Sequence, residues 1–358
     1  MLIDSSDSSE YFGYESFRDF KSDPEMLRYP NACPIRSCIT TPVLIPFGKS
    51  NKPFCSTHGI RLHSNTFVYW NGDGRKEKNK ARLRNFRIRP DLAEKIALNS
   101  VGKAETHRLG YENSEDALTW NVFVSLAEAK KLSLAVKFLT GFDVGAEPDL
   151  YLWGKLVDVT GTRNETELFQ PLRDVRDLLE QGIRKFNTEP DVMLVLDGQL
   201  VICVEAKFTS GNTLAHEEEV EVGDKPKDRN GLLERYFDEA PEGTKRAIKR
   251  DKIGANLHSQ LFRNIIFASA MAKGCKWHVA NLVSQTQWNC GKKSKQNSFV
   301  NPEESIRSYL NQSFQNCFSF RTWEQLYREL VKDDAELDRL NTYFLTKSAH
   351  YRRAFELD

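Results

Sequence analysis

Apolar positions are sparse and irregular in the first third of the chain and strongly periodic beyond it. Residues 1–30 show neither helical nor strand periodicity, which predicts a loose arm, and residues 31–63 set Pro, Cys and His between short apolar pieces. From Ser114 onward an apolar stripe recurs every four residues, which predicts a helix over 114–132 with Ser114 as its N-cap. The regular part of the fold is therefore expected to begin near Ser114.

The rest of the chain alternates between strand-like and helix-like patterns. Two apolar, β-rich runs flank Asp197-Gly198, a strong hairpin signal, whereas residues 208–252 are charged and broken by Gly and Pro, as an insertion or surface loop would be. This order predicts an α/β (α+β) fold with a central mixed sheet. The other expected elements are a strand over 151–159, helices over 168–183 and 253–273, a strand over 276–283 and a mainly helical segment after 291.

Composition and charge narrow the classes of function. The 358 residues hold 51 Lys+Arg against 50 Asp+Glu, a formal net charge of +1, so any nucleic-acid footprint must be local. No run approaches the roughly 18 apolar residues that cross a bilayer, and the acidic, Ser-rich start lacks the pattern of a secretory signal. We therefore expect a cytoplasmic protein without membrane contact, divided into an arm (1–30), a module (31–110), a core (111–290) and an extension (291–358).

The predicted hairpin carries the candidate chemistry. Side chains alternate along a strand, so Glu205 and Lys207 share a face, and Asp191 begins the neighbouring strand. Carboxylates on adjacent strands suit Mg²⁺, and a lysine beside them could orient a water or stabilise charge on a phosphoryl oxygen. A two-residue turn would set Asp191 and Glu205 on opposite faces, whereas a three-residue loop over 197–199 would pair them directly. We predict the longer loop; the alternative for these residues is a surface salt bridge.

Pro190-Asp191, thirteen further residues and then Glu205-Ala206-Lys207 resemble the signature of the PD-(D/E)xK nuclease superfamily, whose fold is that of restriction endonucleases. The resemblance covers roughly residues 111–285 and implies an αβββαβ core in which the helix near 165–185 is an insertion. It further implies Asp191 and Glu205 as ligands of Mg²⁺ (or Mn²⁺) and Lys207 as the catalytic lysine that positions the nucleophile. The implied reaction is hydrolysis of a phosphodiester bond to 5′-phosphate and 3′-hydroxyl ends.

Two further candidates follow from the resemblance, because members often add an acid from the first core helix and a glutamine from the helix after the motif. Glu115 lies three and seven residues before Leu118 and Val122, on the inward face of its helix. Favourable interaction with the helix dipole explains Glu115 equally well. Gln260 is the candidate glutamine, and a plain polar helix residue is the alternative.

The spacing of cysteine and histidine predicts a second metal site near the N-terminus. Cys33-x4-Cys38 and Cys55-x2-His58 are two close pairs separated by sixteen residues, so S and N donors could converge on a structural Zn²⁺. His63 competes with His58 as the fourth ligand, and unligated thiols are the alternative. Cys275-x2-His278 has a similar spacing but falls on the expected strand 276–283, where core packing is the better interpretation.

A basic segment follows this module. Phe86 and Ile88 alternate with cations, which is consistent with a strand laid along a nucleic-acid backbone; an exposed, solvated segment is the alternative. A second basic cluster lies over 245–252. The candidate phosphate-binding residues are Arg75, Lys76, Lys78, Lys80, Arg82, Arg84, Arg87 and Arg89.

The leading hypothesis is therefore a Mg²⁺-dependent DNA endonuclease, in restriction or antiphage defence, with a zinc module that helps to bind the substrate. One alternative is a zinc-containing nucleic-acid-binding protein whose nuclease fold is catalytically idle, and another is an RNA-cleaving nuclease. A homodimer would suit double-strand cleavage and companion defence proteins would suit a restriction system; the sequence leaves both open.

Overall fold

A computed structural model describes residues 31–357, except residues 37, 48–49, 64–65, 73, 99–106, 164–166, 183–186, 213–218, 223–224, 255–256 and 287–301. The chain forms two compact units. The first unit is the chain up to Asn121 together with Asp338–Asp358, and the second unit is Val122–Leu337. The arm expected over residues 1–30 lies outside the described residues. Within the described ranges, no helix combines the length and the apolar character needed to span a bilayer.

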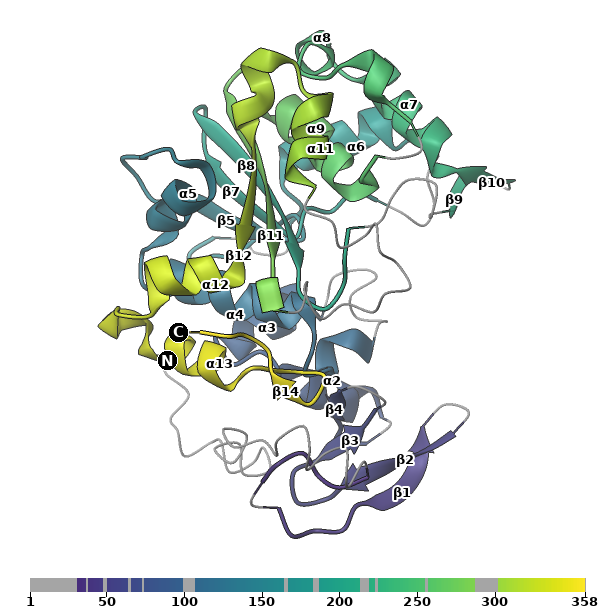
Figure 1. Cartoon of the computed structure of the whole chain (residues 1–358), viewed down its shortest axis with the longest axis vertical. Helices are drawn as coiled ribbons and strands as arrows, with labels where there is room; N and C mark the ends of the chain where they lie inside the picture. Colours follow the sequence, from purple (N-terminus) through teal and green to yellow (C-terminus); the bar gives the residue numbers. More distant parts are fainter. Residues whose placement is uncertain are drawn as a thin grey trace. The chain divides into compact units, whose positions relative to one another are not determined.

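A six-stranded mixed sheet forms the centre of the second unit (Figure 1), and it confirms the expected mixed α/β class. The strand order is β12-β11-β8-β7-β5-β6; β12, β11 and β8 are parallel, whereas β8, β7, β5 and β6 are antiparallel to one another in turn. The strands are β5 (Asp149–Leu152), β6 (Lys155–Leu156), β7 (Val192–Leu196), β8 (Leu200–Lys207), β11 (Lys276–Val283) and β12 (Phe318–Thr322).

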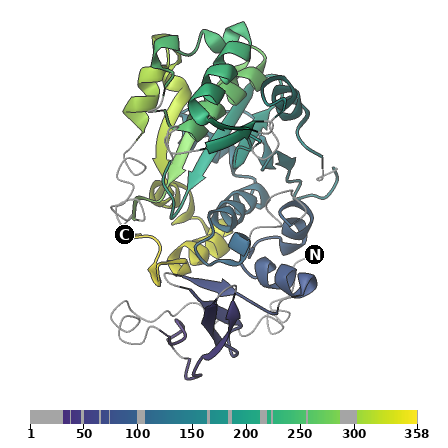
Figure 2. The same ribbon diagram turned by 90° about the vertical axis from the view of Figure 1, so that its right-hand side faces the viewer.

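Helices cover both faces of this sheet. On one face α9 (Ser259–Ala272) packs on β8 and β11, with α6 (Gln170–Leu179) and α7 (Arg229–Glu239) against it; Figure 2 views the sheet from this side. On the other face α5 (Leu132–Thr140) lies against β11 and β12. The remaining short elements of this unit are α8 (Glu242–Lys245), η5 (Arg250–Lys252), α11 (Glu303–Tyr309), η7 (Gln312–Cys317), α12 (Trp323–Leu326), η8 (Tyr327–Val331) and η9 (Ala335–Leu337).

The structure of the second unit differs from two of the elements expected from the sequence. The strand expected over 151–159 is a tight hairpin, because Trp153 and Gly154 turn the chain with φ of 51° and 78°. Glycine is favoured at position 154 because L side chains rarely adopt its positive φ, and a Cβ there would also lie 2.5 Å from Cδ1 of Leu168. For the segment 208–252 only the expected surface loop is wrong, since α7 contributes Leu232, Leu233 and Tyr236 to the core and β9 (Glu219–Val222) pairs with β10 (Lys225–Asp228); the alternative, an insertion into the core, stays a prediction.

The first unit contains a four-stranded antiparallel sheet in the order β1-β2-β3-β4. α4 (Glu115–Glu128) begins in this unit and ends in the second, and Ser114 accepts a hydrogen bond from the amide of Ala117 at 3.2 Å, which confirms the predicted N-cap. The other elements are β1 (Val43–Phe47), β2 (Ser50–Cys55), β3 (Ile60–Leu62), β4 (Phe67–Tyr69), α2 (Arg75–Leu83), α3 (Pro90–Ile96), η3 (His107–Gly110), α13 (Asp338–Thr346), β13 (Ser348–Ala349) and β14 (Arg352–Arg353).

The described part of the segment after 291 is mainly helical, as expected, but its elements are divided between the two units and include strands that the sequence did not indicate. β12 joins the central sheet of the second unit, whereas α13 and the β13–β14 hairpin belong to the first unit. Such pairing depends on strands far apart in the sequence, which local periodicity does not report.

Candidate active site and metal cluster

The β7–β8 hairpin sets two of the candidate residues side by side. Its ladder pairs Leu196 with Leu200, so residues 197–199 form a three-residue loop whose glycine adopts a φ of 63°. The ladder continues to the start of β7, and one further step sets Asp191 opposite Glu205. The predicted register, on which a site on one face depends, is confirmed.

Glu205 and Lys207 form a buried ion pair at the end of β8. Nζ of Lys207 donates to Oε1 of Glu205 over 2.6 Å, and their side chains are only 6% and 4% exposed. The alternative of a surface salt bridge is therefore wrong. Two desolvated charges recover their solvation cost only in part through mutual attraction. A buried pair of this kind is therefore weak evidence for a stabilising role.

A third side chain, from α9, completes this pair, and the sequence analysis missed it. Nδ2 of Asn264 donates to Oε2 of Glu205 over 2.8 Å, and Asn264 is 2% exposed. Asn264 lies four residues after Gln260, so both residues are on the same face of α9. Gln260 is half-buried, and its predicted role stays a prediction. Nearly every residue of α9 is buried, polar ones included, so the apolar pattern of the helix did not show which face meets the hairpin.

Asp191 is fixed by main-chain contacts to the same motif. Its Oδ2 accepts a hydrogen bond from the amide of Ala206 at 2.9 Å, and its carbonyl accepts one from the amide of Trp153 at 3.3 Å. Since Ala206 lies between Glu205 and Lys207, the first bond attaches Asp191 directly to the other two residues.

Two buried amides lie beside Glu205. Asn281 is the register partner of Glu205 on β11, and its Oδ1 accepts a hydrogen bond from Nδ2 of Asn212 at 3.3 Å. Asn281 is 0% and Asn212 is 1% exposed. Together with Glu205, Lys207 and Asn264 they form a group of buried polar side chains at one end of the sheet. Because burying polar groups is costly, such a group is typical of a functional site.

The donors at this end of the sheet fit a divalent ion with oxygen ligands. Each carboxylate oxygen has two lone pairs, so the bonds from Lys207 and Asn264 leave Glu205 able to bind an ion. Mg²⁺ needs only one or two carboxylates because it retains several waters. Asp191 and Glu205 could therefore hold it. Glu115 lies in the first turn of α4 and belongs to the first unit, and its role as an additional acid stays a prediction.

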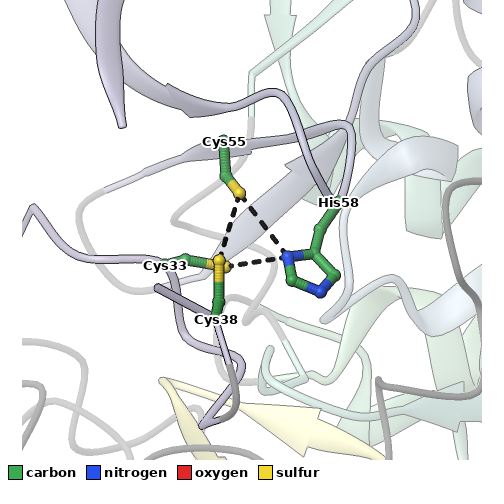
Figure 3. A group of neighbouring side chains, drawn as sticks. All are labelled: Cys33, Cys38, Cys55 and His58. Carbon is green, nitrogen blue, oxygen red and sulfur yellow. Dashed lines mark hydrogen bonds between the residues drawn. The ribbon is translucent and has the colours of Figure 1, made fainter. Parts of the chain in front are cut away.

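The first unit brings the four predicted zinc ligands together (Figure 3). Their ligand atoms all lie within 4.8 Å of one another, and Cys33, Cys55 and His58 are buried. Sγ of Cys38 lies 3.6 Å from Sγ of Cys55, and Nδ1 of His58 lies 3.5 Å from Sγ of Cys33 and of Cys55. Tetrahedral Zn²⁺ would give edges of about 3.8 Å between sulfur atoms and about 3.5 Å between sulfur and nitrogen.

Proton sharing among these thiols favours a bound cation. A hydrogen bond from Cys33 lowers the pKa of Cys55 to about 4, whereas that same bond and burial raise the pKa of Cys33. A thiolate is thus held among further sulfur atoms, which a divalent cation would stabilise. His63 is not part of the cluster, because its ring packs against Tyr111 at 5.6 Å. The cluster could therefore bind zinc through three cysteines and His58.

The basic segment is a helix followed by a turn, so the predicted strand is wrong. Phe86 and Ile88 do not line a strand; they are 1% and 3% exposed and belong to the core. Arg84 follows α2 and donates to the carbonyls of His58 at 2.6 Å and Gly59 at 2.7 Å. This guanidinium therefore attaches the end of α2 to the loop that carries a zinc ligand.

Several predicted phosphate-binding cations have other partners. Arg82 is buried, Arg87 lies 5.6 Å from the ring of Tyr343, and Arg89 forms an ion pair with Asp91 at 2.8 Å. The prediction is retained for the exposed Arg75, Lys76 and Lys80 and the half-buried Lys78, all on α2.

The second basic cluster and the Cys275–His278 pair have structural partners. Lys245 pairs with Glu242, and Arg250 pairs with Asp238. Nε2 of His278 lies 2.9 Å from Oγ of Ser319, in agreement with core packing.

Comparison with known families gives one match. The model of a family described as restriction endonuclease associating with ARP matches residues 50–347, which include the whole β7–β8 hairpin. No curated protein and no solved structure matches the chain.

Proposed function

Because the chain belongs to the family of restriction endonucleases associating with ARP, we propose that it is a Mg²⁺-dependent endonuclease that hydrolyses DNA in restriction or antiphage defence. The observation that carries this proposal is the buried Glu205–Lys207 pair, with Asp191 bonded to the residue between them. A carboxylate pair and an ammonium group at the end of a sheet suit hydrolysis of a phosphodiester bond.

The order of elements supports a restriction-endonuclease-like core in the second unit. α4, which begins in the first unit, is followed by β5, β7, β8, α9 and β11 in the order αβββαβ, with α5, β6, α6 and residues 208–252 as additions. The position of the β7–β8 hairpin in this order supports the resemblance to the PD-(D/E)xK superfamily.

Each residue of the site has a distinct role in the proposed reaction. Asp191 and Glu205 would hold the ion, which supplies polarisation of water and neutralisation of phosphate charge. Asn264 orients Oε2 of Glu205. Lys207 holds Oε1 of the same carboxylate, and its ammonium has further protons to donate to a water or to a phosphoryl oxygen.

We further propose that the Cys₃His cluster holds structural Zn²⁺ and that the cations of α2 contact the DNA backbone. Arg84 supports a link between the two, since it follows α2 and donates to the carbonyls of His58 and Gly59. The family description names an association with ARP, and we propose a companion protein on that basis.

Digestion of plasmid DNA tests the proposed function. Purified protein is incubated with Mg²⁺ or with EDTA, and the ends of the products are mapped. We expect Mg²⁺-dependent cleavage to 5′-phosphate and 3′-hydroxyl ends and its loss in Glu205→Gln/Lys207→Met. Binding of DNA without nicking, whichever divalent metal is supplied, would overturn the proposal.

One observation favours a binding protein as a second candidate. Lys207 donates a hydrogen bond directly to Glu205, as it would in a catalytically idle site. The Cys₃His cluster and the cations of α2 would suffice to bind nucleic acid without cleavage. Retained DNA affinity without cleavage identifies this case, and parallel digestion of RNA identifies an RNA-cleaving nuclease.

A further inference from the structure

Three parallel strands of the second unit end on one row beside the candidate active site. Lys207 of β8, Val283 of β11 and Thr322 of β12 are successive register partners. The residues that directly follow β11 and β12, Ser284 and Trp323, both donate a hydrogen bond to the backbone carbonyl of Lys207. The amide of Ser284 donates to the carbonyl of Lys207 at 3.1 Å, and Nε1 of Trp323 donates to the same oxygen at 3.0 Å.

These two donors match the capacity of the Lys207 carbonyl, since a carbonyl oxygen has two lone pairs. Trp323 is 0% exposed, and its ring lies edge-on to Phe123 at a centroid distance of 6.4 Å. The side chain is therefore enclosed, and its single polar group points at the last residue of β8.

Glu324, the residue after Trp323, accepts hydrogen bonds from the residues that follow β11. Its Oε2 accepts a hydrogen bond from the amide of Gln285 at 2.9 Å. Its Oε1 accepts from the amide and hydroxyl of Thr286, both at 3.1 Å, and from the hydroxyl of Ser284 at 3.2 Å. Because Ser284 is itself a donor to Lys207, Glu324 supports the same carbonyl through β11.

A capping box fixes the point at which these two side chains leave the sheet. Oγ1 of Thr322 accepts a hydrogen bond from the amide of Gln325 at 3.1 Å, and the Gln325 side chain accepts one from the amide of Thr322 at 2.9 Å. This reciprocal cap ends β12 on the row of Lys207 and begins α12 at the next residue.

We propose that Trp323 is a positioning residue for Lys207, supported by Glu324. Lys207 is the last residue of its strand, so a rotation of its backbone would carry Nζ away from the carboxylate of Glu205. Two donors on the Lys207 carbonyl oppose that rotation. The consequence for catalysis rests on the proposed function, whereas the effect on Lys207 itself does not.

Trp323→Phe tests this inference, and the chain offers a matched control. Trp120, in the first unit, is also 0% exposed and donates through Nε1 to a backbone carbonyl, that of Ile88, at 2.6 Å. It too has an edge-on phenylalanine, Phe86, at 5.7 Å. Trp120→Phe therefore deletes the same group in the same kind of surroundings, away from Lys207 in the sequence and in another unit.

Two readouts are measured on folded full-length protein. In Trp323→Phe, kcat for plasmid cleavage should fall about 10- to 100-fold at unchanged KM. A displacement of a catalytic group by about 1 Å can lower the rate of the chemical step by that much. The rate at which an amine-reactive reagent labels Lys207, followed by peptide mass spectrometry, should rise. Trp120→Phe should leave both at the wild-type values.

Equal effects of the two substitutions, or unchanged labelling of Lys207 in Trp323→Phe, would overturn the inference. If Trp323→Phe does not fold, Glu324→Gln is labelled in the same way; it must expose Lys207 to the reagent, and protection equal to wild type overturns the inference. If wild-type protein cuts no nucleic acid, the proposed function fails, and the labelling comparison still decides the role of Trp323.

Discussion

Replacement of Lys207 by methionine removes one charge from a pair that the second unit keeps out of water. The side chains of Lys207 and Glu205 are 6% and 4% exposed, and their charged atoms lie 2.6 Å apart. Methionine retains much of the apolar length of lysine, so packing changes little. The main effect is that the Glu205 carboxylate stays buried without its charged partner, while Asn264 remains bonded to Oε2.

Removal of one partner from a buried ion pair destabilises a protein by about 3–5 kcal/mol. For a unit of this size each kcal/mol lowers the melting temperature by about 2–4 °C, so Lys207→Met should melt about 6–20 °C below wild type. Glu205→Gln/Lys207→Met, which removes both charges, should be about as stable as wild type or more so. Alanine at Glu205 or Lys207 alone is therefore not expected to leave folding intact.

Thermal unfolding followed by circular dichroism, together with plasmid cleavage, checks this reasoning. The double variant should combine near-wild-type stability with no Mg²⁺-dependent cleavage, which would separate chemistry from folding at this site. A Lys207→Met protein as stable as wild type would show that the carboxylate is not desolvated. Cleavage by the double variant would show that the catalytic groups lie elsewhere.

Three further predictions concern the first unit. A zinc chelator, or Cys55→Ala, should release bound zinc and lower the melting temperature, whereas Cys317→Ala outside the cluster should release none; a metal-free wild-type protein would refute the site. Replacing Arg75, Lys76 and Lys80 with alanine should flatten the slope of log affinity against log salt by about 0.9 per lost phosphate contact, and an unchanged slope would exclude α2 from the interface. Burial lowers the pKa of Lys347 to about 8, so the unfolded chain binds more protons above that pH, and the free energy of unfolding should rise from about pH 8 to about pH 10. Urea titrations across this range should show no such rise from this group in Glu112→Gln/Lys347→Met.

The elements that the sequence predicted well are those specified within a few residues. The loop at 197–199 follows from Asp197-Gly198 and from the requirement that two carboxylates share a face, and its register is confirmed. β11 runs over Lys276–Val283 as expected, because its apolar run is short and clearly bounded. The convergence of the cysteine pairs on His58 also followed from spacing alone.

The errors arise where long-range packing overrides a local pattern. Phe86 and Ile88 alternate with cations as strand residues do, yet both are buried in a turn after α2. The segment 208–252 is rich in charge, but the apolar residues of α7 suffice to bury that helix against α9. β12 (Phe318–Thr322) pairs with β11 (Lys276–Val283), which lies much earlier in the chain, and no local pattern near Phe318 indicates that pairing.

The sequence by itself determined the hairpin, the shared face of Glu205 and Lys207 and the ligand spacing of the cysteine pairs, because turn chemistry and side-chain alternation act within one element. Only the tertiary structure decided that Asn264 reaches Glu205, that Trp323 reaches Lys207 and that Arg84 faces the metal loop. Each of those contacts joins elements from distant parts of the chain, and their geometry is set by how the helices and strands pack together.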